Sequence, residues 1–287
     1  MIIEMLRTWC FIFSHPLASK NLTSAFRRWL QWQAGSRILN LPVVIPFIGS
    51  SQLIVEKGMT GATGNIYVGL HEFTDMAFCL HLLRSGDLFV DVGANIGSYT
   101  ILASKVVGAK SFTLEPVPKT FKYLKRNIYL NEIEHLVDAR CCAAGLAIGS
   151  LMFSTNLDTM NKVVTTDYEG SSIEVPVESL DKLLDNLKPT LIKIDVEGFE
   201  PEVIAGAKNT LLCNSLLAVL LETVTPEIQE ILQKSGFESV SYDPFKRELL
   251  NKDAKRSGDN YLWIRHPSLV IERCKTATKH EVLGISF

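Results

Sequence analysis

Carboxylate side chains follow two apolar runs that are typical of buried strands. Asp195 and Glu197 come directly after "LIKI", and Glu222 lies near the end of "VLLET". Because the carboxyl ends of parallel strands share one edge of a sheet, we expect these three side chains to meet in one crevice. A positioned carboxylate can take a proton from a hydroxyl group or hold that group in place. We therefore predict Asp195, Glu197 and Glu222 as catalytic residues.

Two other interpretations of this acidic segment exist. Clustered carboxylates can hold a divalent cation, but no Asn or His ligand joins them in the sequence, so we predict no metal site. Glu200 and Glu202 flank Pro201 and are assigned to the first turn of the next helix, where acidic side chains stabilise the helix dipole.

A glycine-rich turn follows another strand, in "LFVDVGANIGSYT" at residues 88–100. Gly93 and Gly97 permit positive φ and close approach of the backbone. The helix that starts near Ser98 offers unpaired N–H groups to a polar ligand, and Asp91 can face a cationic group. The spacing D-x-G-x-x-x-G is neither that of dinucleotide-binding enzymes nor that of a P-loop.

Glu115 ends the next strand, "SFTLEP", roughly 20 residues past this turn, where sheets of this kind place the acid that binds ribose hydroxyls. A carboxylate can accept two hydrogen bonds from a vicinal diol. The expected ligand is therefore a nucleoside without a bulky pyrophosphate.

Elements that position these residues alternate regularly from Asp87 onward. Apolar strands at 88–92, 110–116, 136–144, 190–197 and 215–223 alternate with helical patterns, and this alternation predicts a mostly parallel sheet covered on both faces. Strands at 237–243 and 260–265, joined by a polar loop at 244–259, predict a closing antiparallel hairpin. Residues 41–70 are expected to form short strands or a hairpin, and residues 71–86 a helix. The predicted fold class is α/β, with a seven-stranded sheet.

Composition excludes several classes of protein. The chain has 287 residues, 47% of them hydrophobic, which is enough for a sizeable core, and its net charge of −2 gives no footprint for nucleic acid. The six cysteines have no CxxC or metal-ligand spacing, which indicates reduced thiols and a cytoplasmic location.

The first 34 residues are expected to form one or two amphipathic helices that cover a core or an oligomer interface. Glu4 and Arg7 interrupt the apolar N-terminus, so we predict no stable membrane insertion, with a peripheral membrane contact as the less favoured alternative. The expected domains are an appendage at 1–60, a main domain at 61–266 and a tail at 267–287.

Taken together, "FVDVGANIGSYT", "LEP" and "LIKIDVEGFEPEVIAGA" resemble the FkbM family of S-adenosylmethionine-dependent methyltransferases, from about Glu72 to about Thr223. The resemblance implies a Rossmann-like class I methyltransferase fold, S-adenosylmethionine as cosubstrate, and O-methylation of a sugar, glycan or natural product. It also implies that particular residues contact the cofactor. These are Glu72, Asp91, Gly93, Asn95, Gly97, Ser98 and Glu115.

The adenine is expected near "CCAAG" at 141–145, where small side chains such as Ala143 admit a ring, although tight turn packing explains Ala143 equally well. Methyl transfer to a hydroxyl needs alignment in a dry site and removal of the hydroxyl proton. Asp195 or Glu197 is predicted to be the general base or positioning group, assisted by Glu222, with His71 in reserve. The rival functions are an NAD-linked oxidoreductase and a catalytically inactive binding protein.

Overall fold

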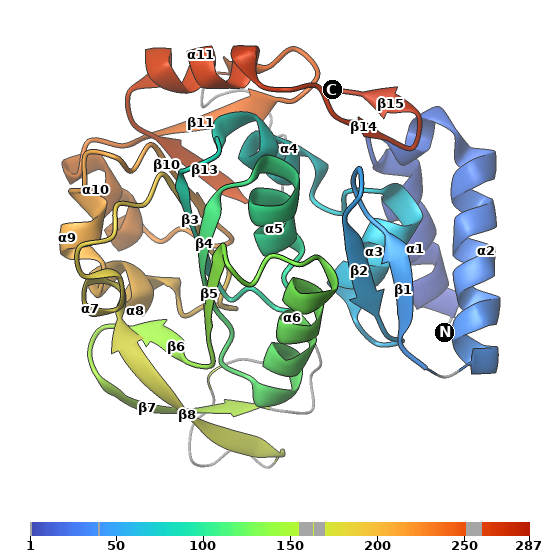
Figure 1. The fold of residues 1–287 in the computed structure, drawn as a ribbon, viewed down its shortest axis with the longest axis horizontal. Coiled ribbons are helices and arrows are strands. Elements are labelled where there is room, and N and C mark those ends of the chain that lie inside the picture. The colour runs from blue at the N-terminus through green and yellow to red at the C-terminus, as the bar shows by residue number, and fades with distance from the viewer. Residues whose placement is uncertain (1, 40, 155–162, 164–169, 251–259) are drawn as a thin grey trace.

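A computed structural model describes residues 2–39, 41–154, 163, 170–250 and 260–287, and its centre is one large twisted sheet (Figure 1). The strand order is β12-β11-β13-β10-β9-β3-β4-β5. The strands are β3 (Leu88–Val92), β4 (Lys110–Leu114), β5 (Val137–Arg140), β9 (Leu191–Ile194), β10 (Ala218–Leu221), β11 (Glu238–Asp243), β12 (Glu248–Leu250) and β13 (Tyr261–Ile264). Strands β5, β4, β3, β9 and β10 are parallel, and β13 runs antiparallel to β10 and β11.

The central strands are mostly apolar because both faces of the sheet are covered. Phe89 and Leu191 point into one core, whereas Val90 and Ile192 point into the other. In Figure 1, helices α4 (Phe73–Leu82), α5 (Ser98–Ile101) and α6 (Pro118–Leu130) cover one side of the sheet. The π-helical segment η2 (Leu102–Val107) continues α5. The other side is covered by α7 (Leu180–Leu184), α8 (Glu200–Ala205), α9 (Lys208–Leu211) and α10 (Pro226–Lys234). The predicted α/β class with a mostly parallel sheet is confirmed.

The strand order reverses beside β3, because the chain proceeds from β3 to β4 and β5 on one side and later places β9 on the other. At such a point the loops that leave neighbouring strands diverge and open a crevice. The glycine turn after β3, Glu115 after β4 and Asp195 after β9 all lie at this edge.

Three details differ from the sequence prediction. The segment "LVDARCCAA" is divided at Cys141–Cys142 between β5 and β6 (Ala143–Gly145), and β6 belongs to a second sheet with β8 (Ser172–Ser179) and β7 (Gly149–Ser154). Residues 60–68, predicted as extended, form α3 (Thr60–Val68), because burial of Ala62, Tyr67 and Val68 outweighs the weak helix propensity of two glycines. β12 lies within the predicted loop 244–259, of which residues 251–259 are outside the described residues.

The N-terminal segment, for which one or two helices are predicted, contains two, α1 (Ile2–Ser14) and α2 (Leu22–Leu39), together with a 3-10 turn and a pair of strands. These are η1 (Ala18–Lys20), which lies between the two helices, β1 (Val43–Pro46) and β2 (Gln52–Val55). Leu53 and Val55 of β2 share a core with Ile101 and Leu124 of the main domain. No helix in the described part of the chain has both the length and the apolar character needed to cross a bilayer.

The C-terminal segment forms α11 (Pro267–Thr276) and the strand pair β14 (Glu281–Val282) and β15 (Ile285–Ser286). Val270, Cys274 and Phe287 are buried in the same core as α4 and β3. Arg247 donates hydrogen bonds to the backbone carbonyl oxygens of Ala277 and Phe287, at 2.6 and 3.0 Å. Residues 267–287 therefore pack on the main domain.

Candidate active site

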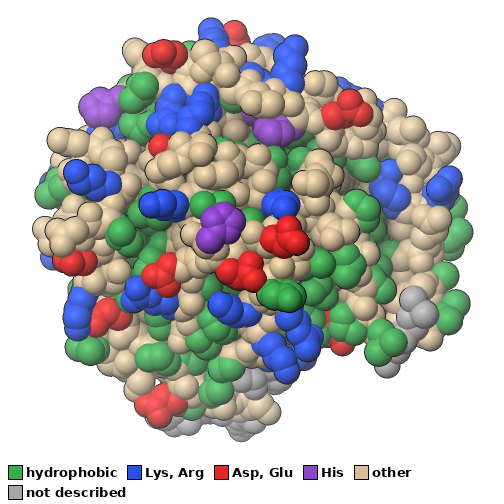
Figure 2. All heavy atoms as spheres, viewed as in Figure 1, with side chains coloured by type: hydrophobic (Ala, Val, Ile, Leu, Met, Phe, Trp, Pro, Cys, Tyr) green, Lys and Arg blue, Asp and Glu red, His purple; other side chains and the backbone are tan. Residues whose placement is uncertain are grey.

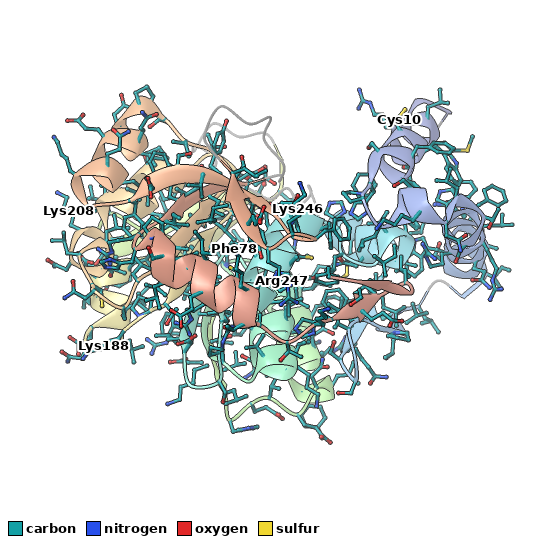
Figure 3. All side chains as sticks on the ribbon, turned by 90° about the horizontal axis from the view of Figure 1, so that it is seen from above. Cys10, Phe78, Lys188, Lys208, Lys246 and Arg247 are labelled. Carbon is teal, nitrogen blue, oxygen red and sulfur yellow. The ribbon has the colours of Figure 1, made fainter. Side chains whose placement is uncertain are left out.

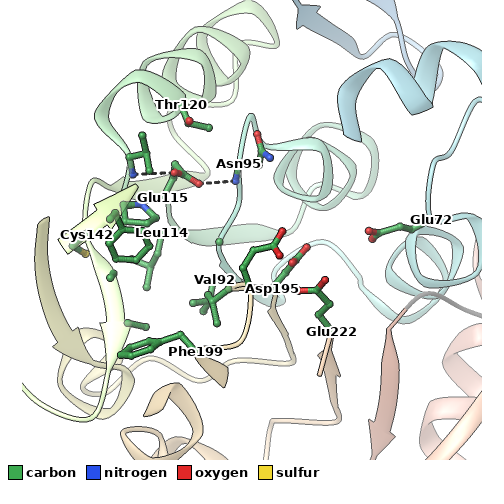
Figure 4. A pocket seen from close by; sticks show the side chains of 18 of the residues that line it. Glu72, Val92, Asn95, Leu114, Glu115, Thr120, Cys142, Asp195, Phe199 and Glu222 are labelled. Atoms are coloured by element: carbon green, nitrogen blue, oxygen red, sulfur yellow. Dashed lines mark hydrogen bonds between the residues drawn. The ribbon is translucent and has the colours of Figure 1, made fainter. Parts of the chain in front are cut away.

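A cavity of about 240 Å³ opens at the carboxyl ends of β3, β4, β9 and β10, where the strand order reverses (Figure 4). Eight of the predicted site residues line it: Glu72, Gly93, Asn95, Glu115, Ala143, Asp195, Glu197 and Glu222. The structure thus brings together side chains that are up to 150 residues apart in the sequence.

The turn after β3 depends on two glycines, for packing reasons. Gly93 has φ +80°, and a Cβ atom there would lie 1.9 Å from the backbone oxygen of Asp195. Gly97 has φ +93°, and a Cβ atom there would lie 2.5 Å from Cδ1 of Leu124. Gly93 therefore lets the β3 turn touch the end of β9, which fixes the distance between the glycine turn and the acidic turn.

Glu115 is buried and holds the glycine turn to the end of β4. Its carboxylate accepts hydrogen bonds from the backbone N–H groups of Asn95 (3.0 Å) and Val117 (2.9 Å) (Figure 4). Burial raises the pKa of Glu115 to about 7, although both hydrogen bonds favour the ionised form. Each oxygen retains an unused lone-pair direction, so the carboxylate can still accept hydrogen bonds from a diol in the cavity.

Three predicted cofactor contacts, at Asp91, Gly97 and Ser98, do not line the cavity. Asp91 is 1% exposed and accepts a hydrogen bond from Oγ1 of Thr100 at 2.7 Å, and its burial raises its pKa to about 6. Gly97 is the residue before α5, and Oγ of Ser98 lies 3.4 Å from Nδ2 of Asn65, which donates a hydrogen bond to it. Asp91 and Ser98 therefore make contacts with other protein side chains rather than with the cavity.

Asp195 forms an ion pair with Lys193, a residue that was not among the predicted site residues. The Nζ–Oδ2 distance is 2.5 Å, and the Lys193 side chain is 4% exposed. Burial opposes ionisation of Asp195, but the Lys193 ammonium lowers its pKa. Burial likewise opposes the charge of Lys193, and Asp195, Glu72 and Asp91 together raise the pKa of Lys193. Asp195 is therefore held ionised at the cavity wall.

Glu222 faces Asp195 from the end of β10, and the two carboxyl groups point toward one another in Figure 4. Burial and the charge of Asp195 raise the pKa of Glu222 to about 8. Two carboxylates this close cannot both ionise readily, so at neutral pH the pair retains one proton, mainly on Glu222.

Glu72 occupies the opposite wall and is held from two directions. The phenol of Tyr99 donates a hydrogen bond to Oε2 of Glu72 at 2.5 Å, and Nδ2 of Asn260 donates another at 3.3 Å. The Lys193 ammonium lies 4.8 Å from the centre of the Tyr99 ring. Tyr99 therefore connects the Glu72 wall to the Lys193–Asp195 pair.

The predicted adenine region has one wall of small residues and two aromatic rings. Cys142, Ala143 and Ala144 line the cavity together with Phe153 from β7 and Phe199 before α8. Apolar rings beside small side chains form an apolar wall that a planar base can contact. The sequence prediction included the small residues but not the rings, because β7 reaches the cavity only through the second sheet.

Lys193 carried a sequence signal that could have identified it. A lysine in the middle of the apolar run "TLIKID" must be buried in a covered sheet, and a buried ammonium needs a carboxylate partner. Asp195 lies two residues away, on the same face of the strand.

Replacing Lys193 with methionine is expected to lower the free energy of unfolding by about 3 kcal/mol, because Asp195 and Asp91 lose their compensating charge. Urea denaturation measures this loss. The double variant Lys193→Met/Asp195→Asn should recover part of it, since no uncompensated charge is then left at position 195. A double variant less stable than Lys193→Met would contradict the ion-pair assignment.

Electrostatics of the cavity favour a cationic ligand that carries hydrogen-bond donors. The lining residues include five carboxyl groups and no Lys or Arg side chain. Asn95 Oδ1 and Glu222 Oε2 are buried with no hydrogen-bond partner in the described residues. A nucleoside with a sulfonium and an ammonium group matches both properties, so the residues present fit S-adenosylmethionine. Within the described residues, no group of three or more His, Cys, Asp or Glu side chains is arranged to hold a metal ion.

Comparison with known proteins finds similarity to methyltransferases. The model of the FkbM methyltransferase domain matches residues 91–246. The chain is 30% identical over 210 residues to the methyltransferase sdnD of Sordaria araneosa, covering 58% of this chain and 79% of that protein. It is 31% identical over 128 residues to the hexuronic acid methyltransferase AglP of Haloferax volcanii, covering 44% of this chain and 52% of that protein. Among solved structures, an FkbM methyltransferase from Methylobacillus flagellatus superposes with a TM-score of 0.43 at 16% identity, covering 74% of this chain and 56% of that chain.

Proposed function

The chain belongs to the FkbM family of methyltransferases, whose methyl donor is S-adenosylmethionine, and from this premise we propose that it methylates a hydroxyl oxygen of a sugar, a glycan or another natural product. The observation that carries the proposal is that one cavity contains both a buried carboxyl group with free acceptor positions, Glu115, and a carboxyl pair that retains one proton, Asp195 and Glu222. The hexuronic acid relative supports a sugar acceptor.

Cofactor binding is assigned to the wall between the glycine turn and the second sheet. Glu115 would accept hydrogen bonds from the two ribose hydroxyls, and the apolar wall that includes Ala143 and Phe153 would contact the adenine. The buried amide oxygen of Asn95 would accept a hydrogen bond from a donor on the ligand. Glu72 would lie at the amino-acid end, where a carboxylate stabilises an ammonium.

When bound, S-adenosylmethionine supplies an electrophilic methyl carbon on a sulfonium. The residues of this chain have three tasks around it: they hold the acceptor in line, exclude water and remove the hydroxyl proton. The Asp195–Glu222 pair faces the cavity and can accept that proton once it has lost its own. Lys193 keeps Asp195 ionised and fixes the orientation of its carboxylate through the 2.5 Å contact. Glu197 lines the same wall and is assigned to positioning the acceptor.

The pH dependence of kcat/KM is expected to follow the titration of the Asp195–Glu222 pair. Glu222 is protonated below its raised pKa of about 8 and ionised above it. The pair can accept a proton from the acceptor hydroxyl only when both carboxyl groups are ionised. The rate should therefore rise with pH and reach half of its maximum near pH 8. A pH–rate profile of Glu222→Gln should lack this rise, whereas Glu202→Gln, at an exposed position on α8, should retain it. A wild-type profile that is flat between pH 6 and pH 9 would remove the pair from the proton transfer.

Two measurements test the overall proposal. Isothermal titration calorimetry should show binding of S-adenosylmethionine and of its demethylated product, and no binding of NAD. Incubation with methyl-labelled cofactor and a panel of sugars, uronic acids and glycan extracts should label a carbohydrate, and mass spectrometry should place the methyl group on oxygen. Label found on nitrogen or carbon would refute O-methylation, and binding of NAD alone would favour the oxidoreductase alternative. Cofactor binding without transfer to any acceptor would favour an inactive binding protein.

A further inference from the structure

The N-terminal helices α1 and α2 expose an unusual density of large apolar side chains. Of the eighteen exposed large hydrophobic residues in the described parts of the chain, seven lie in these two helices. Leu6 is 57% exposed, Leu30 is 50% exposed and Ile38 is 79% exposed. Figure 3 shows the two helices at the edge of the molecule, with Cys10 labelled at the periphery and side chains directed outward. This surface, formed by the outward-facing residues of α1 and α2, is named the hairpin face.

An aromatic cluster joins the two helices into one continuous surface. The Trp9 ring lies 5.5 Å from Phe13 on its own helix, and 5.4 Å from Phe26 and 5.2 Å from Trp29 on the neighbouring helix. Phe13 and Phe26 are about half exposed. Trp and Phe with one covered side and one exposed side are typical of proteins that enter the boundary between lipid headgroups and acyl chains.

The charge of this segment is opposite to that of the rest of the chain. Residues 1–40 contain five basic side chains and one acidic side chain, a net charge of +4, so the remaining residues carry −6 of the total of −2. Arg7, Arg27 and Arg37 are exposed beside the apolar side chains. In Figure 2, Lys and Arg side chains lie beside hydrophobic ones on the side of the molecule where α2 is located.

We propose that the hairpin face binds the surface of a bilayer that contains anionic lipids. Exposed aromatic and aliphatic groups would enter the headgroup boundary, and the arginines would contact lipid phosphates and carboxylates. The same charge opposes a symmetric dimer through this face, because it would set two cationic surfaces against each other. The proposal does not depend on the identity of the methyl acceptor.

The helix pair α1–α2 is fixed to the main domain, so a bilayer bound to it has a defined position relative to the cavity. Ile12 and Ala25 pack against Tyr67 and Val68 of α3, and Arg28 donates two hydrogen bonds to the Tyr67 carbonyl, at 2.7 and 3.0 Å. The bilayer would therefore lie beside the main domain in one orientation.

Co-sedimentation of the full chain with large unilamellar vesicles tests the proposal. Vesicles of phosphatidylcholine with 30 mol% phosphatidylserine should bind the protein at least about tenfold more tightly than vesicles of phosphatidylcholine alone. Raising the salt concentration should weaken the binding to the anionic vesicles.

Two double variants separate the charged and apolar contributions. Arg27→Gln/Arg37→Gln should weaken binding about 10- to 30-fold, and Leu6→Gln/Leu30→Gln should weaken it at least about tenfold. The matched controls are Lys188→Gln/Lys208→Gln, at exposed positions on the opposite side in Figure 3, and Leu187→Gln/Leu212→Gln. Both controls should bind as the wild type does, and circular dichroism confirms that every variant is folded.

An environment-sensitive thiol probe on the exposed Cys10 provides a second measurement. Its emission should shift to the blue with anionic vesicles, and the Cys10→Ala variant should lose the signal. Equal binding to both kinds of vesicle, or hairpin variants that bind like the wild type, would overturn the proposal. A dimer that Leu6→Gln/Leu30→Gln dissociates, without vesicle binding, would assign the face to a second copy of the chain instead.

Discussion

Asp195→Asn is expected to reduce kcat by about 100- to 10,000-fold, the range that a positioned acid or base contributes. The substitution preserves the shape of the side chain and removes the charge that Lys193 stabilises at 2.5 Å. It also removes the negative neighbour that helps to raise the pKa of Glu222, so the remaining carboxyl group becomes a weaker base. Single-turnover measurements with saturating S-adenosylmethionine isolate this effect on the methyl-transfer step.

Cofactor affinity distinguishes a chemical role of Asp195 from a structural one. The dissociation constant for S-adenosylmethionine should change less than about threefold in Asp195→Asn, because the proposed ribose and adenine contacts lie on other strands. The control Asp185→Asn changes an exposed aspartate with φ +43°, a conformation that asparagine tolerates, and should keep full activity. Normal turnover by Asp195→Asn would exclude this residue from the chemistry.

Glu115→Gln is expected to weaken S-adenosylmethionine binding by about 10- to 150-fold, which corresponds to about 1.5–3 kcal/mol for hydrogen bonds to a charged group. Glutamine keeps one acceptor oxygen but replaces the other with an NH₂ donor, and that donor opposes either a ribose hydroxyl or a backbone N–H group. Calorimetry of the variant with the cofactor and with its demethylated product measures the loss.

Two effects of Glu115→Gln can be separated: loss of the ribose contact and loss of support for the glycine turn. If Glu115 acts on the ribose, a cofactor analogue that lacks both ribose hydroxyls should bind wild type and Glu115→Gln with similar affinity. The exposed control Glu238→Gln should bind S-adenosylmethionine as the wild type does. A variant that discriminates between cofactor and analogue as strongly as the wild type would show that Glu115 only supports the turn through Asn95 and Val117.

Sequence patterns predicted the main sheet well because its strands are apolar runs bounded by turn residues. β3, β9 and β10 are buried on both faces and could be located from their apolar runs in the sequence. The division of residues 136–144 between two sheets could not be predicted, because it depends on pairing between β6 and β8, about 30 residues apart. Helix α3 was not predicted because its two glycines lower its helix propensity, and it is stabilised instead by burial against α1 and α2.

The residues of the candidate site could be predicted where an acidic side chain directly follows a predicted strand. Asp195, Glu115 and Glu222 follow strands, and the parallel order places them at one edge. The direction in which a side chain points was harder to predict: Asp91 also lies at a strand end but is buried against Thr100. Phe153 and Phe199 reach the cavity from segments that are not adjacent to the glycine turn in sequence, so no local pattern identified them.

The ring of Phe11 in α1 lies 5.0 Å from the ring of His71, which is part of the cavity wall. Helix α1 therefore contributes both to the outer surface of the N-terminal segment and to the packing behind the cavity. A cavity ligand that displaces His71 would also perturb α1. The effect is reciprocal: if a bilayer bound at α1 and α2 changes the affinity of the cavity for its ligand by some factor, the bound ligand changes the affinity for the bilayer by the same factor.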